Sequence, residues 1–181
     1  MQELSMNVLD VTENSVSAGS TLTYITLNID TLQNIQTLTI SDNGKGMSED
    51  MVKNVTDPFC TSRTTRKVGL GLPFLKMAAE MTGGSMTITS QLGKGTTVTA
   101  QFVLGHIDLM PIGDIASSVA GLIQCNPEVD FVYTVSKDGE SFTADTREIK
   151  QTLDGVSVSQ PAVAVWIREF LQENTDNILL K

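Results

Sequence analysis

The sequence of 181 residues has few cysteines and no long apolar segment. Its two cysteines, Cys60 and Cys125, lack the spacing of a metal site and do not make a disulfide framework, which indicates a reducing compartment. No segment has the apolar length that spans a membrane, and the first residues lack the basic and apolar regions of a signal peptide. We therefore expect a cytoplasmic protein that does not insert into a membrane.

Basic residues are also scarce, with 12 Lys and Arg against 21 Asp and Glu and a net charge of −9. This balance argues against a nucleic-acid-binding surface. The acidic excess lies in the second part of the chain, because residues 1–105 hold 7 basic and 9 acidic side chains whereas residues 106–181 hold 5 and 12. An anionic ligand would therefore meet less repulsion in the first part.

Hydrophobic residues make up 40% of the chain, enough for a globular protein with its own core. Their spacing predicts a helix over residues 3–17, strands over 22–30 and 35–41, a short helix from 48, a helix opening at 69–71, and strands over 85–90 and 96–104. A helix over 114–124, a hairpin over 130–136 and 140–144, and two final helices follow. We divide the chain into a first domain, residues 1–105, and a small C-terminal α/β appendage, residues 106–181.

A turn with two glycines, residues 42–47, directly follows the second predicted strand. Strand alternation places Leu38, Ile40 and Asp42 on one side, so a carboxylate lines up with two core residues. A carboxylate in that place is costly unless it meets a donor or a charge, and glycines beside it let backbone approach a ligand. The stretch is either the floor of a ligand site or an ordinary turn.

Two further segments favour an anionic ligand. Residues 56–68 read as a loop that carries Arg63, Arg66 and Lys67, either as a solvated charge cluster or as an anion-facing one. The glycine pair at 69–71 then opens a helix, where free N–H groups and the helix dipole favour a phosphate.

In their order along the chain, these segments resemble the motifs of the GHKL ATPase superfamily of gyrase, MutL mismatch-repair proteins and histidine kinases. The likeness covers about residues 3–104, and from Asp57 to Phe102 it is closest to histidine kinases. The matching stretches are the N box at 10–19, the first glycine box at 42–47, the start of the ATP lid at 57–61, the second glycine box at 69–72 and the last conserved turn at 93–97. The resemblance implies the Bergerat fold, a two-layer α/β (α+β) sandwich with a mixed, mostly antiparallel sheet and helices on one face.

The resemblance also implies ATP and Mg²⁺ as ligands. Asn14 would coordinate Mg²⁺ through its side-chain oxygen, Asp42 would accept the adenine amino group, and Thr97 would support it through water. The other implied residues shape the adenine floor or hold the phosphates: Gly44, Gly46, Met47, Thr61, Arg63, Lys67, Gly69, Leu70, Gly71 and Leu72.

Two departures from the family pattern bear on chemistry. In the gyrase and MutL branch a glutamate four residues before the asparagine is the general base, and here that position is Asp10, whose reach is shorter by roughly 1.5 Å. We therefore expect slow or absent hydrolysis, with Asp10 as a weak base at most. The only histidine, His106, follows the ATP-binding segment and is followed by Ile107 where a phosphoacceptor box has an acid, so we expect it to be structural.

The sequence thus predicts a Mg·ATP-binding regulator of the histidine kinase-like class that phosphorylates or controls a partner protein. One alternative is a slow ATPase whose nucleotide cycle drives formation of a homodimer, as in the MutL branch. Another is a non-catalytic nucleotide-binding module that uses its acidic C-terminal segment for protein contacts. The apolar stripe of the last helix is expected to pack on the main domain, with a partner-binding face as the alternative; it comprises Val163, Trp166, Ile167, Phe170 and Leu171.

Overall fold

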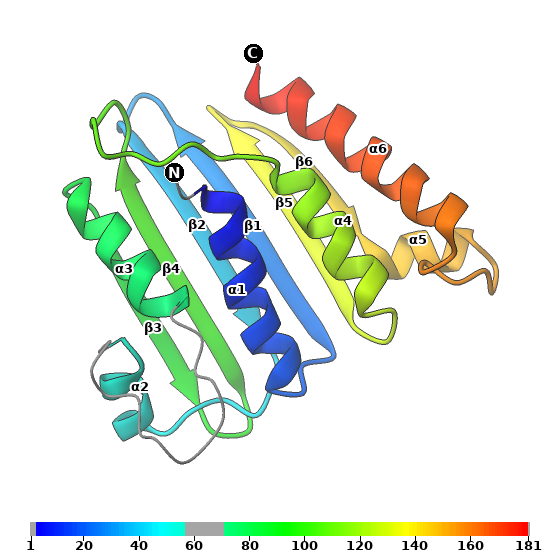
Figure 1. Ribbon diagram of the computed structural model, residues 1–181, viewed down its shortest axis with the longest axis horizontal. Coiled ribbons are helices and arrows are strands. Elements are labelled where there is room, and N and C mark those ends of the chain that lie inside the picture. Colours follow the sequence, from blue (N-terminus) through cyan, green and yellow to red (C-terminus); the bar gives the residue numbers. More distant parts are fainter. Residues whose placement is uncertain (1–2, 57–70, 181) are drawn as a thin grey trace.

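The computed structural model describes residues 3–56 and 71–180, which form one six-stranded sheet with helices over one face (Figure 1). The elements are α1 (Leu4–Ser17), β1 (Leu22–Asp30), β2 (Ile35–Asp42), α2 (Glu49–Val55), α3 (Gly71–Met81), β3 (Ser85–Gln91), β4 (Gly95–Val103), α4 (Ile115–Cys125), β5 (Asp130–Lys137), β6 (Glu140–Asp145), α5 (Thr146–Thr152) and α6 (Pro161–Leu179). The predicted two-layer α/β fold class is confirmed.

The strand order is β3-β4-β2-β1-β5-β6. Every neighbouring pair is antiparallel except β1 and β5, which run parallel in a register from Leu22 opposite Asp130 to Ile29 opposite Lys137. The segment predicted as an appendage therefore extends the sheet of the first domain. Whether residues 1–105 and 106–181 are independent domains stays a prediction. In the structure the two parts share one sheet, because β5 of the second part pairs with β1 of the first.

One face of the sheet forms the core because apolar and polar residues alternate along the strands. The helix-facing side of the central strands buries Ile25, Leu27, Leu38 and Ile40, against which α1 places Leu4, Val8 and Val11. The opposite side is polar, and one row of the register carries a threonine on every strand: Thr87, Thr99, Thr39, Thr26, Thr134 and Thr143. Threonine has a high strand propensity, and its hydroxyl is well solvated by water. This face of the sheet therefore needs no covering helices.

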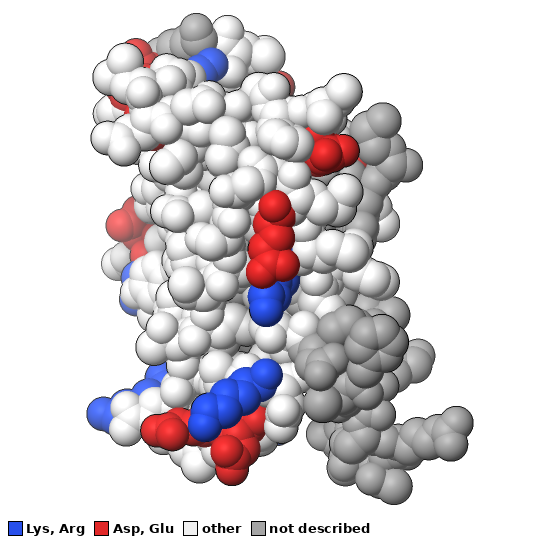
Figure 2. All heavy atoms as spheres, turned by 90° about the vertical axis from the view of Figure 1, so that its left-hand side faces the viewer, with Lys and Arg blue, Asp and Glu red and all other residues white. Residues whose placement is uncertain are grey.

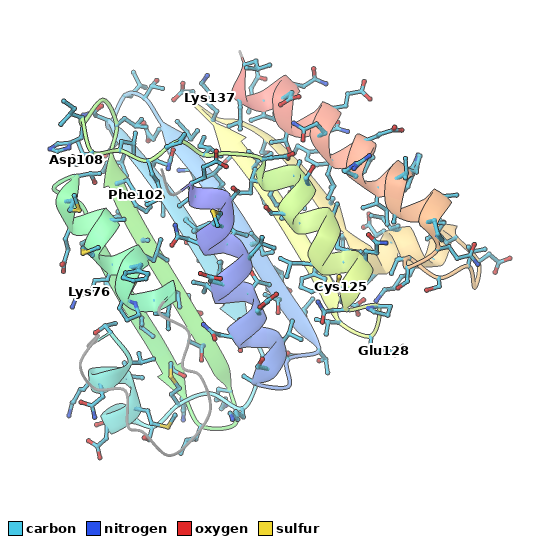
Figure 3. The ribbon with its side chains drawn as sticks, in the orientation of Figure 1. Lys76, Phe102, Asp108, Cys125, Glu128 and Lys137 are labelled. Carbon is cyan, nitrogen blue, oxygen red and sulfur yellow. The ribbon has the colours of Figure 1, made fainter. Side chains whose placement is uncertain are left out.

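The C-terminal helix α6 covers the end of the sheet formed by β5 and β6 (Figure 1). Ile167 and Leu171 from its predicted apolar stripe are buried, whereas Trp166 keeps 48% of its surface exposed. The Lys137 ammonium donates to the carbonyl of Leu179 over 2.8 Å and so holds the last turn of α6 beside the end of β5 (Figure 3). None of the helices among residues 3–56 and 71–180 is long and apolar enough to cross a membrane.

Candidate functional site

Asp42 ends β2 on the helix-facing side of the sheet, as the alternation predicted. The Ser15 hydroxyl of α1 donates to its Oδ2 over 2.7 Å, and the backbone N–H of Gly44 donates to its Oδ1 over 2.9 Å. The carboxylate therefore has the donors that its half-buried position requires. Ser15 was not among the predicted residues, although its place next to Asn14 on α1 could have suggested it.

The threonine that shares a face with Asp42 is Thr96, and the prediction for Thr97 is corrected. In the register of β2 and β4, Thr96 lies opposite Asp42 and Thr97 lies opposite Ser41. The hydroxyls of Ser41 and Thr97 are 2.7 Å apart on the outer face, on the far side of the sheet from α1. Since directly opposed residues point to the same face, Thr96 is the candidate partner of Asp42.

The turn after Asp42 is tied to the neighbouring strand β3. The backbone N–H of Met47 donates to the Ser90 hydroxyl over 2.8 Å, and Ser90 lies 2.9 Å from the hydroxyl of Thr96. Gly46 has a φ of +65°, and a Cβ added there would lie 2.0 Å from the carbonyl oxygen of Gln91. The close approach of two backbones at this point excludes any side chain.

The other end of the site lies where α1 meets the start of α3. Asp10 and Asn14 are one turn apart on α1, and a Cβ added to Gly71 would lie only 2.8 Å from the Cβ of Asp10. The first backbone N–H groups of α3 have no partner within the helix, so this end of α3 presents donors beside Asp10. Leu72 is buried in the core, which gives its side chain a packing role.

Helix α1 thus joins the two ends of the site. Asp10 lies beside the start of α3, Asn14 follows one turn later on the same side of α1, and Ser15 holds Asp42 at the end of β2. Figure 1 shows α1 over the central strands of the sheet, beside α3. Five further predicted residues lie outside the described part of the chain: Thr61, Arg63, Lys67, Gly69 and Leu70. Among residues 3–56 and 71–180, no group of three or more His, Cys, Asp or Glu side chains could hold a metal ion.

His106 lies in the irregular segment between β4 and α4, where it is exposed. Its Nδ1 accepts a hydrogen bond from the backbone N–H of Asp108 over 3.2 Å. The expectation that His106 has a structural role stays a prediction.

The sequence comparison identifies the family. Residues 1–106 match the family described as "Histidine kinase-, DNA gyrase B-, and HSP90-like ATPase", and the chain belongs to this family. The match ends shortly after β4, so it does not include α4, the β5–β6 hairpin or the last two helices.

Two bacterial relatives are named as a kinase and as a sensor protein. Sporulation kinase D of Bacillus subtilis is 33% identical over 92 residues, which cover 51% of this chain and 18% of that protein. Sensor protein SrrB of Staphylococcus aureus is 31% identical over 102 residues, which cover 54% of this chain and 17% of that protein. The chain thus spans less than a fifth of the length of these relatives.

Two solved structures share the fold. The MutL ATPase domain of Aquifex aeolicus, complexed with ADP, superposes with a TM-score of 0.51 and 12% identity over 85% of this chain and 70% of that one. The N-terminal domain of a DNA repair protein gives a TM-score of 0.56 and 14% identity over 80% of this chain and 52% of that one. At these identities the likeness concerns the fold.

Proposed function

We propose that this chain binds Mg·ATP and, through the bound nucleotide, phosphorylates or otherwise controls a protein partner. The observation that carries the proposal is the carboxylate of Asp42, which is held on the core side of the sheet by Ser15 and Gly44. Each of its oxygens can accept a further hydrogen bond. The site therefore suits a flat ligand that presents an N–H group, as the adenine amino group does.

The adenine end of the proposed site is built by β2, β3 and β4. Thr96 shares the face of Asp42, and Ser90 fixes both Thr96 and the backbone of Met47. Gly46 lies in close contact with the backbone of Gln91 and Gly95, which leaves no room for a side chain at this position. A fold shared with a MutL ATPase domain that was solved with ADP supports a nucleotide as the ligand.

The phosphate end would lie between α1 and the start of α3. The first N–H groups of α3, which have no acceptor within the helix, suit phosphate oxygens, and the basic residues Arg63 and Lys67 would add positive charge from the predicted lid. Asn14 would give Mg²⁺ one amide oxygen, and the phosphates and water would complete its oxygen shell. When bound, Mg²⁺ would neutralise charge on the phosphates.

Hydrolysis is expected to be slow or absent. Asp10 is the only candidate base that α1 places at this end, and its carboxylate reaches roughly 1.5 Å less far than a glutamate would. A Cβ added to Gly71 would lie 2.8 Å from the Cβ of Asp10, so α1 and α3 are already close at this point. Transfer to a partner, which needs mainly positioning of the phosphoryl group, is therefore favoured over use of water.

Control of a protein partner is supported by the surface beside the phosphate end. Helix α3 exposes Phe74, Met77 and Met81 on one side. The same helix carries an exposed ion pair, Lys76 with Glu80 at 3.9 Å, and Figure 2, which looks onto this side of the molecule, shows charged side chains set among uncharged ones. Exposed apolar residues grouped in this way are typical of surfaces that contact proteins.

Transfer of labelled γ-phosphate tests the proposal. The intact chain is incubated with labelled Mg·ATP and a cell extract, and proteins captured with and without ATP are identified. We expect label in one captured protein and little release of free phosphate; the Asp42→Asn variant is the control for a specific nucleotide site. Rapid steady-state phosphate release without transfer would favour the ATPase alternative, and capture without either reaction would favour the non-catalytic module.

The Asn14→Ala variant tests the phosphate end separately. Removing the amide should abolish the Mg²⁺ dependence of ATP binding measured by calorimetry. Ser17→Ala is a matched control one turn further along α1 at an exposed position. A variant at Asn14 that binds ATP with unchanged Mg²⁺ dependence would rule out its role as a ligand.

A further inference from the structure

The strand β6 forms one edge of the sheet. Among residues 3–56 and 71–180 it pairs with β5 alone, and nothing in the described chain adds a strand on its other side. An edge strand presents unpaired backbone N–H and C=O groups, and proteins usually protect such edges with charge, proline or a covering element. The middle of β6 is instead uncharged, with Ser141, Phe142, Thr143 and Ala144 in succession.

An apolar surface of α6 lies beside this edge. The ring of Phe142 meets the ring of Phe170 edge-on, with the ring centroids 5.5 Å apart. Trp166 stacks on Phe170, with a centroid distance of 5.3 Å and an angle of 6° between the ring planes. Trp166 is 48% exposed and its neighbour Val165 is 45% exposed. We name these four residues, Phe142, Val165, Trp166 and Phe170, the aromatic edge. Three aromatic rings in contact, with one half in solvent, are typical of the centre of a protein interface.

The edge of β6 is complementary to a second copy of itself. In an antiparallel pairing centred on Phe142, the two Phe142 residues oppose each other and Ser141 opposes Thr143 of the second copy. Residues that oppose each other share a face, so the rings of both copies would meet on the helix side. The hydroxyls on the other side can both donate and accept, and no charge faces a like charge along the paired strands.

The charges at the two ends of β6 also match. The strand begins at the turn over residues 137–140, where Asp138 accepts from Thr31 and the Lys137 ammonium is directed to the carbonyl of Leu179. With Glu140, this turn keeps a net negative charge. The strand ends next to Arg147, whose side chain is 50% exposed while it bonds to Asp145. Antiparallel pairing brings Arg147 of each copy toward the acidic turn of the other. The guanidinium has more donors than Asp145 uses, so it can serve both groups.

We propose that this chain forms a two-fold homodimer in which the β6 strands pair antiparallel and the aromatic edges of both copies pack together. The dimer would join two six-stranded sheets into one continuous sheet, with both copies of α6 over the junction. An interface of this kind is isologous, because the same residues are used on both sides. It needs no nucleotide, so its test does not depend on the proposed function.

The mass and the tryptophan fluorescence of the intact chain test the proposal. Trp166 is the only tryptophan, so its emission reports on this surface directly. We expect light scattering to give twice the chain mass of 19.5 kDa at high concentration. On dilution the mass should fall to that of one chain, and acrylamide quenching of Trp166 should rise over the same concentrations. A single-chain mass at every concentration would overturn the proposal.

Two variants and their matched controls identify the surface. Trp166→Glu and Thr143→Lys place charge on the aromatic edge and on β6, and both should give a single-chain mass. Leu92→Glu and Thr87→Lys introduce the same two charged residues at exposed positions at the β3 end of the sheet, and these variants should keep the dimer. Circular dichroism should show the native secondary structure in all four. A folded Trp166→Glu or Thr143→Lys variant that keeps the doubled mass would contradict the proposed interface.

Discussion

Asp42 combines two properties that suit recognition of a base. It is fixed in orientation, because Ser15 and Gly44 donate to different oxygens of the same carboxylate. When ionised it can only accept hydrogen bonds, so it favours a ligand edge that donates. The adenine amino group donates, whereas the guanine carbonyl at the matching position accepts. A site that leaves a buried acceptor of a ligand without a donor discriminates strongly against that ligand, here guanine.

Asp42→Asn should abolish measurable ATP binding and leave the fold intact. The amide oxygen can still accept from Gly44, and the amide nitrogen can donate to Ser15, so the local hydrogen bonds persist. The nitrogen would then point its donors at the adenine amino group. Loss of the hydrogen bond to a charged acceptor costs about 1.5–3 kcal/mol of binding free energy. The repulsion between the amide donors and the adenine amino group adds to this loss. Calorimetry measures the affinity and thermal unfolding measures the fold; unchanged affinity would show that Asp42 does not contact the nucleotide.

Tyr133 gives the fold a dependence on alkaline pH. Burial raises the pKa of Tyr133 to about 12 from an ordinary value of 10.0, although its hydroxyl bonds to Thr175 at 3.1 Å. Since the folded pKa lies above the unfolded one, the stabilisation is complete below pH 10 and is lost as pH rises toward 12. We expect the free energy of unfolding to fall by about 1.4 kcal/mol between about pH 8 and about pH 11 from this group.

Urea unfolding at both pH values measures this effect. The Tyr133→Phe variant should lose this part of the pH dependence, because the ionisable hydroxyl is gone. The other tyrosine, Tyr24, is 42% exposed, so Tyr24→Phe is the matched control and should behave like the unmodified chain. An equal pH dependence in all three proteins would exclude Tyr133 as the source.

At the scale of elements, the turn over residues 42–47 is held by backbone packing more than by its own sequence. Gly46→Ala would place a Cβ 2.0 Å from the carbonyl oxygen of Gln91. We expect a loss of about 2–4 kcal/mol in the free energy of unfolding, from steric conflict added to the strained φ. Gly93→Ala is the control, because Gly93 has a similar φ of +74° but nothing lies near its Cβ. Urea unfolding that gives equal losses for both variants would contradict this packing.

The sequence predicted the elements well, because apolar spacing and glycine positions determine them locally. It did not predict which of two adjacent threonines faces the site. The faces of β4 depend on the register of Asp42 opposite Thr96, and that register is set by contacts between strands. Ser15 was missed for a similar reason, since its role arises only when α1 packs against the end of β2.

At the scale of the whole molecule, the C-terminal segment completes the sheet. The parallel pairing of β1 with β5 joins residues about 108 positions apart, and neither strand carries a local signal for that partner. For this reason the sequence indicated an appendage where the structure has a continuous sheet. Helix α4 also buries Ile115, Val119 and Ile123 in the common core.

A fragment of residues 1–105 should therefore be unstable. Removing β5 exposes the backbone edge of β1, and removing α4 exposes the side of α1 that α4 covers. We expect the fragment to aggregate or to lose a cooperative thermal transition followed by circular dichroism. A soluble fragment that melts at the temperature of the full chain would instead support two independent domains.

The most direct test of a nucleotide site is a pair of calorimetric titrations of the intact chain, one with Mg·ATP and one with Mg·GTP. We predict saturable binding of one ATP per chain and at least about a hundredfold weaker binding of GTP, because the guanine carbonyl at the position of the adenine amino group cannot donate a hydrogen bond to Asp42. Absence of ATP binding, or equal binding of both nucleotides, would contradict this prediction.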